Sequence, residues 1–272
     1  MDQCGIQCIE ADVMDRHTLH EPLDMVDVVY NLASPPPGGS AEDYARFNGG
    51  ALKNLLEEAN EHGAKVFVHL SCLDVYGSAG PVEANLQPRP RDEYQRAKLD
   101  GEKIVSDFGR EKPDMKVRVV RAARALGPRD TTLTVPLLKM IERGRVMLPP
   151  GGSSAMSFSH PKDIAQSLLK AATYPGDWEV CLVKSFDATT EDYSRALSSV
   201  TGKKAEVKSA GLFSGKTLLP QYTVEQIKAG VMLKQQDSWK KISYTPSYTM
   251  EKTVEEVSEW YRKEPWATQD LA

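Results

Sequence analysis

Short segments with the apolar content of strands recur along the first half of the chain, at residues 5–13, 26–33, 65–70 and 115–121, and the second of them is a nearly continuous apolar run. Runs of this length are typical of strands that are buried on both faces of a parallel sheet. Helical spacing of apolar residues fills two of the intervals, over residues 41–62 and 94–109. Because strand, helix, strand units imply right-handed parallel crossovers, the pattern predicts an α/β fold with a doubly wound, Rossmann-like parallel sheet.

A tyrosine and a lysine stand four residues apart at the start of the second predicted helix. Tyr94 and Lys98 therefore share one helical face, one turn apart. A cation beside a phenol favours the phenolate, so such a pair can transfer protons at neutral pH. Tyr248 has a lysine at the same spacing, but no strand end precedes it, and a solvated helix face is the simpler interpretation there. Before Tyr94, by contrast, the strand at residues 65–70 runs directly into small polar residues.

The residues around this pair resemble the extended short-chain dehydrogenase/reductase family, which contains NAD(P)-dependent sugar-nucleotide epimerases, dehydratases and reductases. The resemblance covers almost the whole chain. It implies that Tyr94 is the catalytic acid/base and that Lys98 binds the nicotinamide ribose and lowers the pKa of the tyrosine. The family places a serine or threonine four residues before the tyrosine of a Val-Tyr-Gly turn, here Tyr76. That position is Cys72 in this chain, with Ser71 one place earlier.

The resemblance also implies NAD or NADP as the cofactor. Asp12 and Val13 match the pair that contacts adenine, and residues 32–34 match the loop beside the pyrophosphate. Asn48 matches an asparagine that braces the active site, and Arg121 begins the segment that closes over the nicotinamide. Besides Tyr94 and Lys98, the expected cofactor-binding residues are Asp12, Val13, Leu32, Ala33, Ser34, Asn48, Leu70 and Arg121.

Two further segments are expected to border the ligand. Residues 34–39, rich in proline and glycine, follow the strand at 26–33, and ligands of doubly wound sheets lie beyond such strand ends. A merely rigid turn is an equal alternative. Asp163 resembles a family residue that anchors a helix at the edge of the substrate cleft. We expect His160 to be structural, because the sequence offers it no acidic partner.

The domain organisation is inferred from the same resemblance. Residues 1–148 form the dinucleotide-binding domain, to which residues 158–184 return, and residues 185–272 form a small substrate-binding lobe with a contribution from 149–157. Helical patterns are present in the lobe at residues 190–202 and 249–263. The lysine-rich sequence between them is interpreted as solvated surface.

Composition excludes several classes of protein. The net charge of −4 over 272 residues leaves no basic stripe for a nucleic acid. No apolar run approaches the ~20 residues of a membrane span, and no signal peptide is present, so a cytoplasmic protein with reduced thiols is expected. Cys4 and Cys8 precede His17 and His20, but the gaps do not match those of zinc fingers. No metal site is expected.

The predicted function is NAD(P)-dependent chemistry at a hydroxyl or keto carbon, as a net oxidation or reduction or as a step of an epimerisation or dehydration. The family makes a nucleotide sugar the first expectation for the substrate, although the loop at residues 33–36 also resembles steroid- and flavonoid-type reductases. A homodimer is left open. The alternative, from a different class, is a catalytically impaired sensor or partner-binding protein. A nucleophilic Cys72 activated by His69 is disfavoured, because residues three apart in a strand point to opposite faces.

The final expectation concerns the phosphate cradle. No Gly-x-x-Gly-x-x-Gly pattern follows any predicted strand, although such a turn lets backbone amides meet a pyrophosphate. We therefore expect an N-terminally truncated form that binds NAD(P) weakly or not at all. The strand at residues 5–13 should then either shift to pair with the strand at 26–33 or remain unpaired and promote association.

Overall fold

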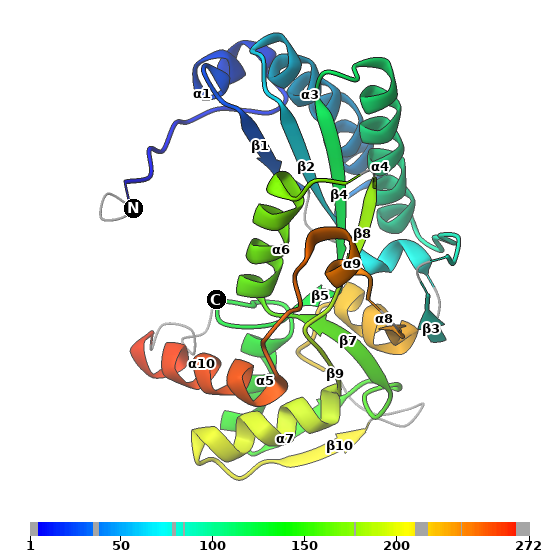
Figure 1. The fold of residues 1–272 in the computed structure, drawn as a ribbon. Helices are drawn as coiled ribbons and strands as arrows, with labels where there is room; N and C mark the ends of the chain where they lie inside the picture. Colours follow the sequence, from blue (N-terminus) through cyan, green and yellow to red (C-terminus); the bar gives the residue numbers. More distant parts are fainter. Residues whose placement is uncertain are drawn as a thin grey trace.

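The centre of the protein is a four-stranded parallel sheet (Figure 1). The structure, a computed structural model, describes residues 5–34, 38–77, 80–83, 85–176, 178–209, 217–234 and 236–264. Every neighbouring pair in the sheet is parallel, and the strands lie in chain order, β1 (Val28–Asn31), β2 (Val66–Cys72), β4 (Lys116–Ala122) and β8 (Val180–Val183). The predicted parallel α/β sheet is confirmed.

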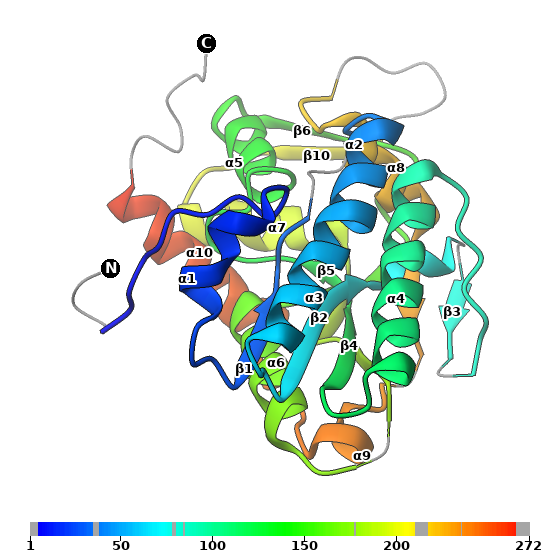
Figure 2. The same ribbon diagram turned by 90° about the horizontal axis from the view of Figure 1, so that it is seen from above.

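Helices cover both faces of this sheet, as Figure 2 shows from above. One face carries α1 (His20–Leu23), α3 (Leu52–Glu61) and α4 (Glu93–Glu111), and the other carries α6 (Pro161–Thr173) and α9 (Ser238–Ile242). Along β2, Phe67 packs against the helices of the first face and Val68 against those of the second face. Because both faces of the sheet are covered, β2 and β4 are buried at most of their positions, polar residues such as His69 and Arg121 included.

The predicted helix over residues 41–62 forms with an interruption. It consists of α2 (Ala41–Ala45), a six-residue π-helical turn η3 (Arg46–Ala51) and α3. Ser40 begins it with a capping box, and Gly63, at φ +82°, follows its end. The π turn carries Asn48, which is buried, and such turns are frequent at functional sites.

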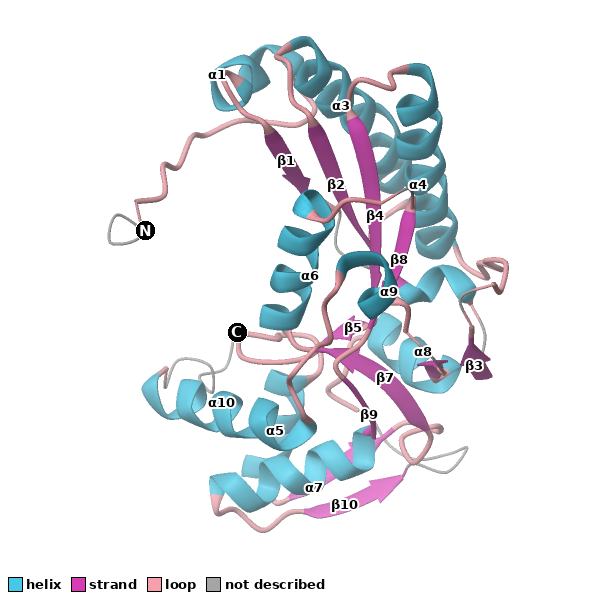
Figure 3. Cartoon of the chain, viewed as in Figure 1, coloured by secondary structure: helices cyan, strands magenta, loops and turns pink. Residues whose placement is uncertain are grey.

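A second core lies beyond the carboxyl ends of the strands, in the lower half of Figure 3. It contains α5 (Thr134–Glu142), β6 (Arg145–Leu148), α7 (Thr190–Thr201) and α10 (Met250–Lys263), whose apolar side chains form one cluster. The expected boundary at residue 148 cuts through this cluster, since α5 and β6 pack with α7. The proposed domain division stays a prediction.

Short strands and one further helix complete this region. β5 (Arg124–Ala125), β7 (Ala155–Ser159) and β9 (Phe186–Thr189) form a mixed sheet, and β10 (Glu206–Ser209) pairs with β6. α8 (Gln221–Ala229) leads into β11 (Val231–Leu233), which pairs with β3 (Gly80–Val82). Two 3₁₀ turns, η2 (Arg16–Leu19) and η4 (Leu73–Tyr76), precede α1 and follow β2.

The predicted lobe helices are confirmed almost to the residue. α7 is capped by Thr189 and ends at Gly202, whose φ is +69°, and α10 is capped by Thr249. No described helix is long and apolar enough to cross a membrane.

The strand expected at residues 5–13 is absent, and this expectation was wrong. Residues 6–12 have no regular secondary structure and are largely exposed, and in Figure 1 they run away from the sheet. Among the described residues, β1 pairs only with β2, so the segment neither shifts across to β1 nor finds another strand. Without a neighbour to accept its backbone hydrogen bonds, an isolated apolar run gains nothing from the extended conformation.

Candidate active site

A cavity of about 470 Å³ opens where β1, β2 and β4 end. Its size is typical of small-molecule sites, and its place beyond the carboxyl ends of parallel strands is where such folds bind ligands. It brings together seven of the expected site residues, namely Leu32, Ser34, Leu70, Ser71, Cys72, Tyr94 and Lys98. The chain segment 35–37 of the expected proline loop lies outside the described residues.

Tyr94 and Lys98 enter this cavity from the first two turns of α4. Asp92 caps the helix by accepting a hydrogen bond from the Gln95 amide, which fixes where these turns begin. Lys98 is buried, and its Nζ donates to the carbonyl oxygen of Leu70 at 3.2 Å. Burial lowers the pKa of Lys98. The ammonium has one protein acceptor in the described hydrogen bonds and two remaining donors for a ligand.

The phenol of Tyr94 is not prepared to ionise near neutral pH in this structure. Its pKa is raised well above the ordinary value, first by burial and then by the neighbouring Cys72 and Asp74. The lowering by Lys98 that the spacing predicted is not among the causes. Tyr94 is therefore a neutral phenol, which is the proton-donating form of an acid/base residue.

Cys72 lies in the same cavity as a protonated thiol. Burial, followed by the charge of Asp74, raises the pKa of Cys72 to about 12. His69 is also buried, which lowers its pKa to about 3, and its Nδ1 lies 3.0 Å from the amide nitrogen of Asn31. A thiolate nucleophile activated by His69 has no support in this arrangement.

The other expected cofactor residues lie away from this cavity. Val13 and Ala33 border a void of about 10 Å³ beside Asn31. Asp12 is exposed and accepts a hydrogen bond from the Met14 amide. Asn48 borders a separate cavity between α2 and α4 and donates weakly to the Tyr44 carbonyl oxygen at 3.4 Å.

Arg121 is held beneath the cavity and does not line it. Its guanidinium pairs with the buried carboxylate of Glu102 at 2.6 Å and donates to the Tyr76 hydroxyl at 2.8 Å. Ser71 donates a short hydrogen bond to the same carboxylate. A buried carboxylate on α4 thus holds the ends of β2 and β4 in place, and it keeps the Ser71 hydroxyl occupied.

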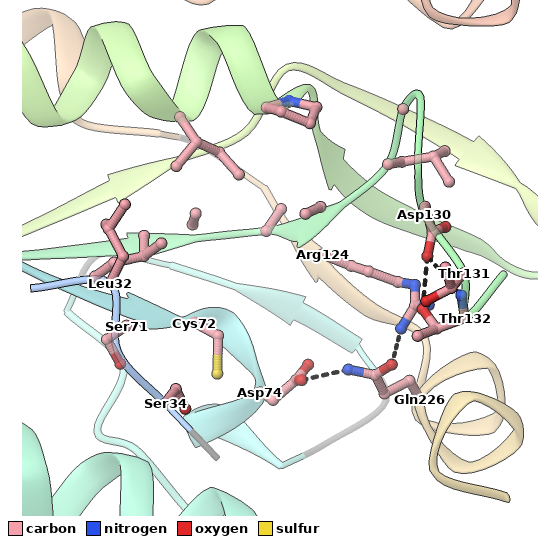
Figure 4. A pocket seen from close by; sticks show the side chains of 18 of the residues that line it. Leu32, Ser34, Ser71, Cys72, Asp74, Arg124, Asp130, Thr131, Thr132 and Gln226 are labelled. Atoms are coloured by element: carbon pink, nitrogen blue, oxygen red, sulfur yellow. Dashed lines mark hydrogen bonds between the residues drawn. The ribbon is translucent and has the colours of Figure 1, made fainter. Parts of the chain in front are cut away.

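A chain of hydrogen bonds across the cavity was not predicted from the sequence (Figure 4). Gln226 of α8 donates to Asp74 at 2.6 Å, and Arg124 donates to Gln226 and, at 2.7 Å, to Thr132. Thr132 in turn donates to Asp130 at 2.6 Å. The only sequence signal was the position of Asp74 inside the turn after β2, because Gln226 is distant in the chain.

A second cavity of about 610 Å³ adjoins the first between the start of α4 and α8. Both cavities are lined by Asp74, Tyr94, Tyr222 and Gln226. Tyr94 therefore lies at the junction of two spaces, each large enough for a small molecule.

His160 and Asp163 stabilise the start of α6. The Nδ1 of His160 accepts a hydrogen bond from the Lys162 amide, and its ring stacks on Tyr248 with centroids 3.7 Å apart. Contrary to expectation it has an acidic neighbour, since its Nε2 lies 3.5 Å from a carboxylate oxygen of Glu256 on α10. Sequence could not place that residue beside it. Asp163 accepts hydrogen bonds from the Tyr244 hydroxyl at 2.5 Å and from backbone amides of the same segment.

The hydrogen-bond donors that line the main cavity suit the nicotinamide and ribose half of NAD or NADP. Lys98 offers ammonium protons to a ribose, Tyr94 offers a phenol, and apolar side chains such as Leu32 and Ile164 can border a flat ring. The glycine-rich turn that holds a pyrophosphate in dinucleotide-binding folds has no counterpart among the described residues before β1. The fit is therefore to the nicotinamide and ribose end.

Comparison with known proteins extends this picture. The chain is 24% identical to the uncharacterized protein y4nG of Sinorhizobium fredii over 95% of this chain and 69% of that protein. It is 23% identical to the mouse sterol-4-alpha-carboxylate 3-dehydrogenase, decarboxylating, over 70% of this chain, and spans 55% of that relative's length.

Solved structures share the fold. The Bacillus cereus UDP-glucuronic acid 4-epimerase in complex with UDP-glucuronic acid and NAD superimposes with a TM-score of 0.78 at 20% identity, covering 96% of this chain and 84% of the other. Residues 2–181 match the model of the NAD dependent epimerase/dehydratase family. With two thirds of its length matched and the Tyr94, Lys98 and Cys72 cavity in place, the chain belongs to the NAD-dependent epimerase/dehydratase family.

Proposed function

We propose that this protein is an NAD(P)-dependent oxidoreductase, epimerase or dehydratase that acts on a hydroxyl or keto carbon of a nucleotide sugar. The observation that carries the proposal is the position of Tyr94 between two adjoining cavities. One cavity fits the nicotinamide end of the cofactor, and the other is free for a second molecule. A proton donor shared by both spaces is what hydride chemistry at a carbinol carbon requires.

NAD or NADP, when bound, would accept or donate the hydride. Tyr94 would exchange the proton of the substrate hydroxyl through its phenol oxygen. Lys98, held by the Leu70 carbonyl, would direct its remaining protons to the ribose and place positive charge near Tyr94. Cys72 would donate a hydrogen bond to the substrate oxygen, because burial keeps its thiol protonated.

The polar chain across the cavity supports a sugar rather than an apolar substrate. Arg124, Thr132 and Gln226 present charged and hydrogen-bonding groups on the side of the cavity that lies toward α8. The hydroxyls and diphosphate of a nucleotide sugar can use several such groups, whereas a sterol carboxylate offers them few polar atoms. The Bacillus cereus neighbour was crystallised with a nucleotide sugar, and the mouse relative is named for a sterol carboxylate, so both substrate classes belong in the test.

The test uses Tyr94→Phe with a panel of UDP- and dTDP-sugars and a sterol, each with NAD⁺ and NADP⁺. We expect turnover of at least one nucleotide sugar to fall by about 10²- to 10⁴-fold, with cofactor affinity nearly unchanged. Tyr248→Phe is the matched control, since that hydroxyl donates to Glu256 and Tyr248 does not line the cavity. Equal turnover by Tyr94→Phe and the unaltered protein would show that Tyr94 takes no part in the reaction.

A second candidate, a sensor that binds without turnover, is favoured by Cys72 and by the raised pKa of Tyr94. A thiol is a weaker donor than the hydroxyl that the family uses at that position. Saturable binding of a nucleotide sugar by calorimetry, with no product over the whole panel, would support the sensor over the enzyme. A homodimer and a cytoplasmic location stay predictions.

A further inference from the structure

A buried carboxylate stands beside two histidines on the face of the sheet that α1 and α3 cover. The ligand atoms of His20, Glu58 and His62 all lie within 4.8 Å of one another. Glu58 is 1% exposed although it belongs to an outer helix. Its Oε1 accepts a hydrogen bond from Arg16, whereas its Oε2 is buried and has no hydrogen-bond partner.

The unpartnered oxygen points at the two imidazoles. Glu58 Oε2 lies 3.2 Å from His20 Nε2 and 3.5 Å from His62 Nε2. Ligands held at about 2.0–2.1 Å around a tetrahedral zinc ion lie roughly 3.4 Å apart. The two distances agree with the edges of such a tetrahedron.

The local charge also favours a cation. Arg16 reaches three carboxylates, those of Glu57, Glu58 and Glu61. One guanidinium against three carboxylates leaves an excess of negative charge. His20, with its side chain 53% exposed, leaves an entrance from solvent.

We propose that His20, Glu58 and His62 form a structural site for a divalent transition metal such as Zn²⁺, with water as the fourth ligand. Two imidazoles and one carboxylate suit zinc or cobalt, whereas magnesium and calcium prefer oxygen ligands. Glu58 and His62 are one helical turn apart on α3, and His20 comes from α1. The ion would fasten α1 to α3, which lie side by side in Figures 1 and 2.

The location argues for a structural role. His62 follows the end of α3, shortly before β2 begins at Val66, whereas Cys72 ends that strand at the cavity. The metal site and the candidate active site thus lie at opposite ends of β2. Metal in this site would act on the stability of the α1 and α3 layer and would not reach the substrate.

This ligand set differs from the group near the start of the chain, Cys4, Cys8, His17 and His20, whose gaps do not match those of zinc fingers. Cys4 lies outside the described residues. Cys8 is exposed and is not grouped with His20 in the part of the chain that the structure describes. The four-residue spacing of Glu58 and His62 is the sequence signal that could have indicated the site. Only the fold brings His20 beside these two residues.

The test is calorimetric titration of Zn²⁺ into the chelator-treated full chain, with Co²⁺ absorption as the probe of geometry. We expect one Zn²⁺ per chain, a tetrahedral Co²⁺ spectrum, and at least ~100-fold weaker binding in both His20→Ala and His62→Ala. His17→Ala is the matched control, because its ring lies 5.8 Å from that of His20 but is not one of the three ligands. It should bind within about 3-fold of the unaltered protein.

Thermal melting separates a metal site from a simple ion pair. Zn²⁺ should raise the melting temperature of the unaltered protein and of His17→Ala, and a chelator should reverse the rise; His62→Ala should not respond. Because both histidines are partly exposed, the variants should fold, and circular dichroism checks this, with His62→Gln as a replacement. Absence of Zn²⁺ uptake, or uptake that His62→Ala leaves unchanged, would overturn the proposal.

Discussion

At the scale of single residues, the chemistry of the main cavity depends on two groups that hold their protons. Tyr94 and Cys72 line it together, and burial raises the pKa of both. Asp74 beside them is also buried, which raises its pKa. At neutral pH Tyr94 and Cys72 are therefore protonated, and because a pKa well above the operating pH makes a group a weaker proton donor, the ligand-free site is not yet matched to proton transfer at neutral pH.

Replacing the thiol tests whether the sulfur matters. In Cys72→Ser a hydroxyl would stand where a weaker donor stood, and we expect turnover to rise, or to become measurable, by roughly 10-fold. The measurement is steady-state turnover of the best nucleotide sugar found. Cys181→Ser, a buried cysteine in β8 outside the cavity, is the control for general effects of removing a thiol. Lower turnover in Cys72→Ser would mean that the site is adapted to sulfur.

At the scale of elements, Asp163 joins the first turn of α6 to the segment before α10. Burial works to raise the pKa of Asp163, but hydrogen bonds from Ser185, Tyr244 and two backbone amides outweigh it, and the pKa is lowered. A carboxyl whose pKa is lower in the folded than in the unfolded state stabilises the fold above the unfolded pKa of ~3.9. That stability is lost as the pH falls through the folded value.

We therefore expect Asp163→Asn to lower the free energy of unfolding at pH 7 by about 2–3 kcal/mol, in line with hydrogen bonds to a charged group. The difference from the unaltered protein should begin to shrink below about pH 4, where Asp163 of the unfolded chain takes up a proton, and should shrink further as the pH falls through the lower folded pKa. Urea unfolding at pH 7 and at pH 3 measures both quantities. Asp107→Asn, an exposed carboxylate on α4 that pairs with Arg110, gives the effect of losing a charge at the surface. A difference that is equal at both pH values would contradict the account.

The elements differ in how far they could be predicted. β2, β4, α7 and α10 have local signals, in that their apolar spacing and their capping residues lie within the element itself. Residues 5–13 had the composition of a strand but no partner, and a strand exists only through its neighbours. The π turn at Asn48 could not be predicted from the sequence either, because apolar spacing does not distinguish a π turn from an α-helical turn.

The candidate site divides in the same way. Tyr94, Lys98, Ser71 and Cys72 were predicted together, because each lies at a strand end or on the first turns of a helix. Arg121 and Asn48 were expected to touch the cofactor, and whether they do stays a prediction; the structure holds Arg121 on Glu102 beneath the cavity. Gln226 and Glu256 could not be predicted, since only the tertiary fold brings them to their partners.

At the scale of the whole molecule, one wall of the cavity is formed where α8 contacts the turn after β2. Gln226 of α8 bonds Asp74 beside β2 and accepts from Arg124. In Gln226→Ala both partners lose this contact, and we expect the KM for the sugar substrate to rise roughly 10-fold with a smaller change in kcat. Steady-state kinetics measures the two constants separately.

Lys228→Ala is the matched control, because Lys228 lies on the same helix but pairs only with Glu225 at the surface. It should leave both constants unchanged. If Gln226→Ala also leaves KM unchanged, the polar chain across the cavity does not contribute to substrate binding.

The contact between Asp74 and Gln226 also has a consequence while the protein is being synthesised. β1, β2 and β4 are joined by successive helices, so their contacts form among near neighbours in the chain and can assemble as it leaves the ribosome. Asp74 and Gln226 are 152 positions apart, and β3 likewise pairs only with the late strand β11. Until α8 emerges, the cavity lined by Tyr94 and Cys72 lacks the wall that Tyr222 and Gln226 supply, so we expect ligand binding to begin only at that point in translation.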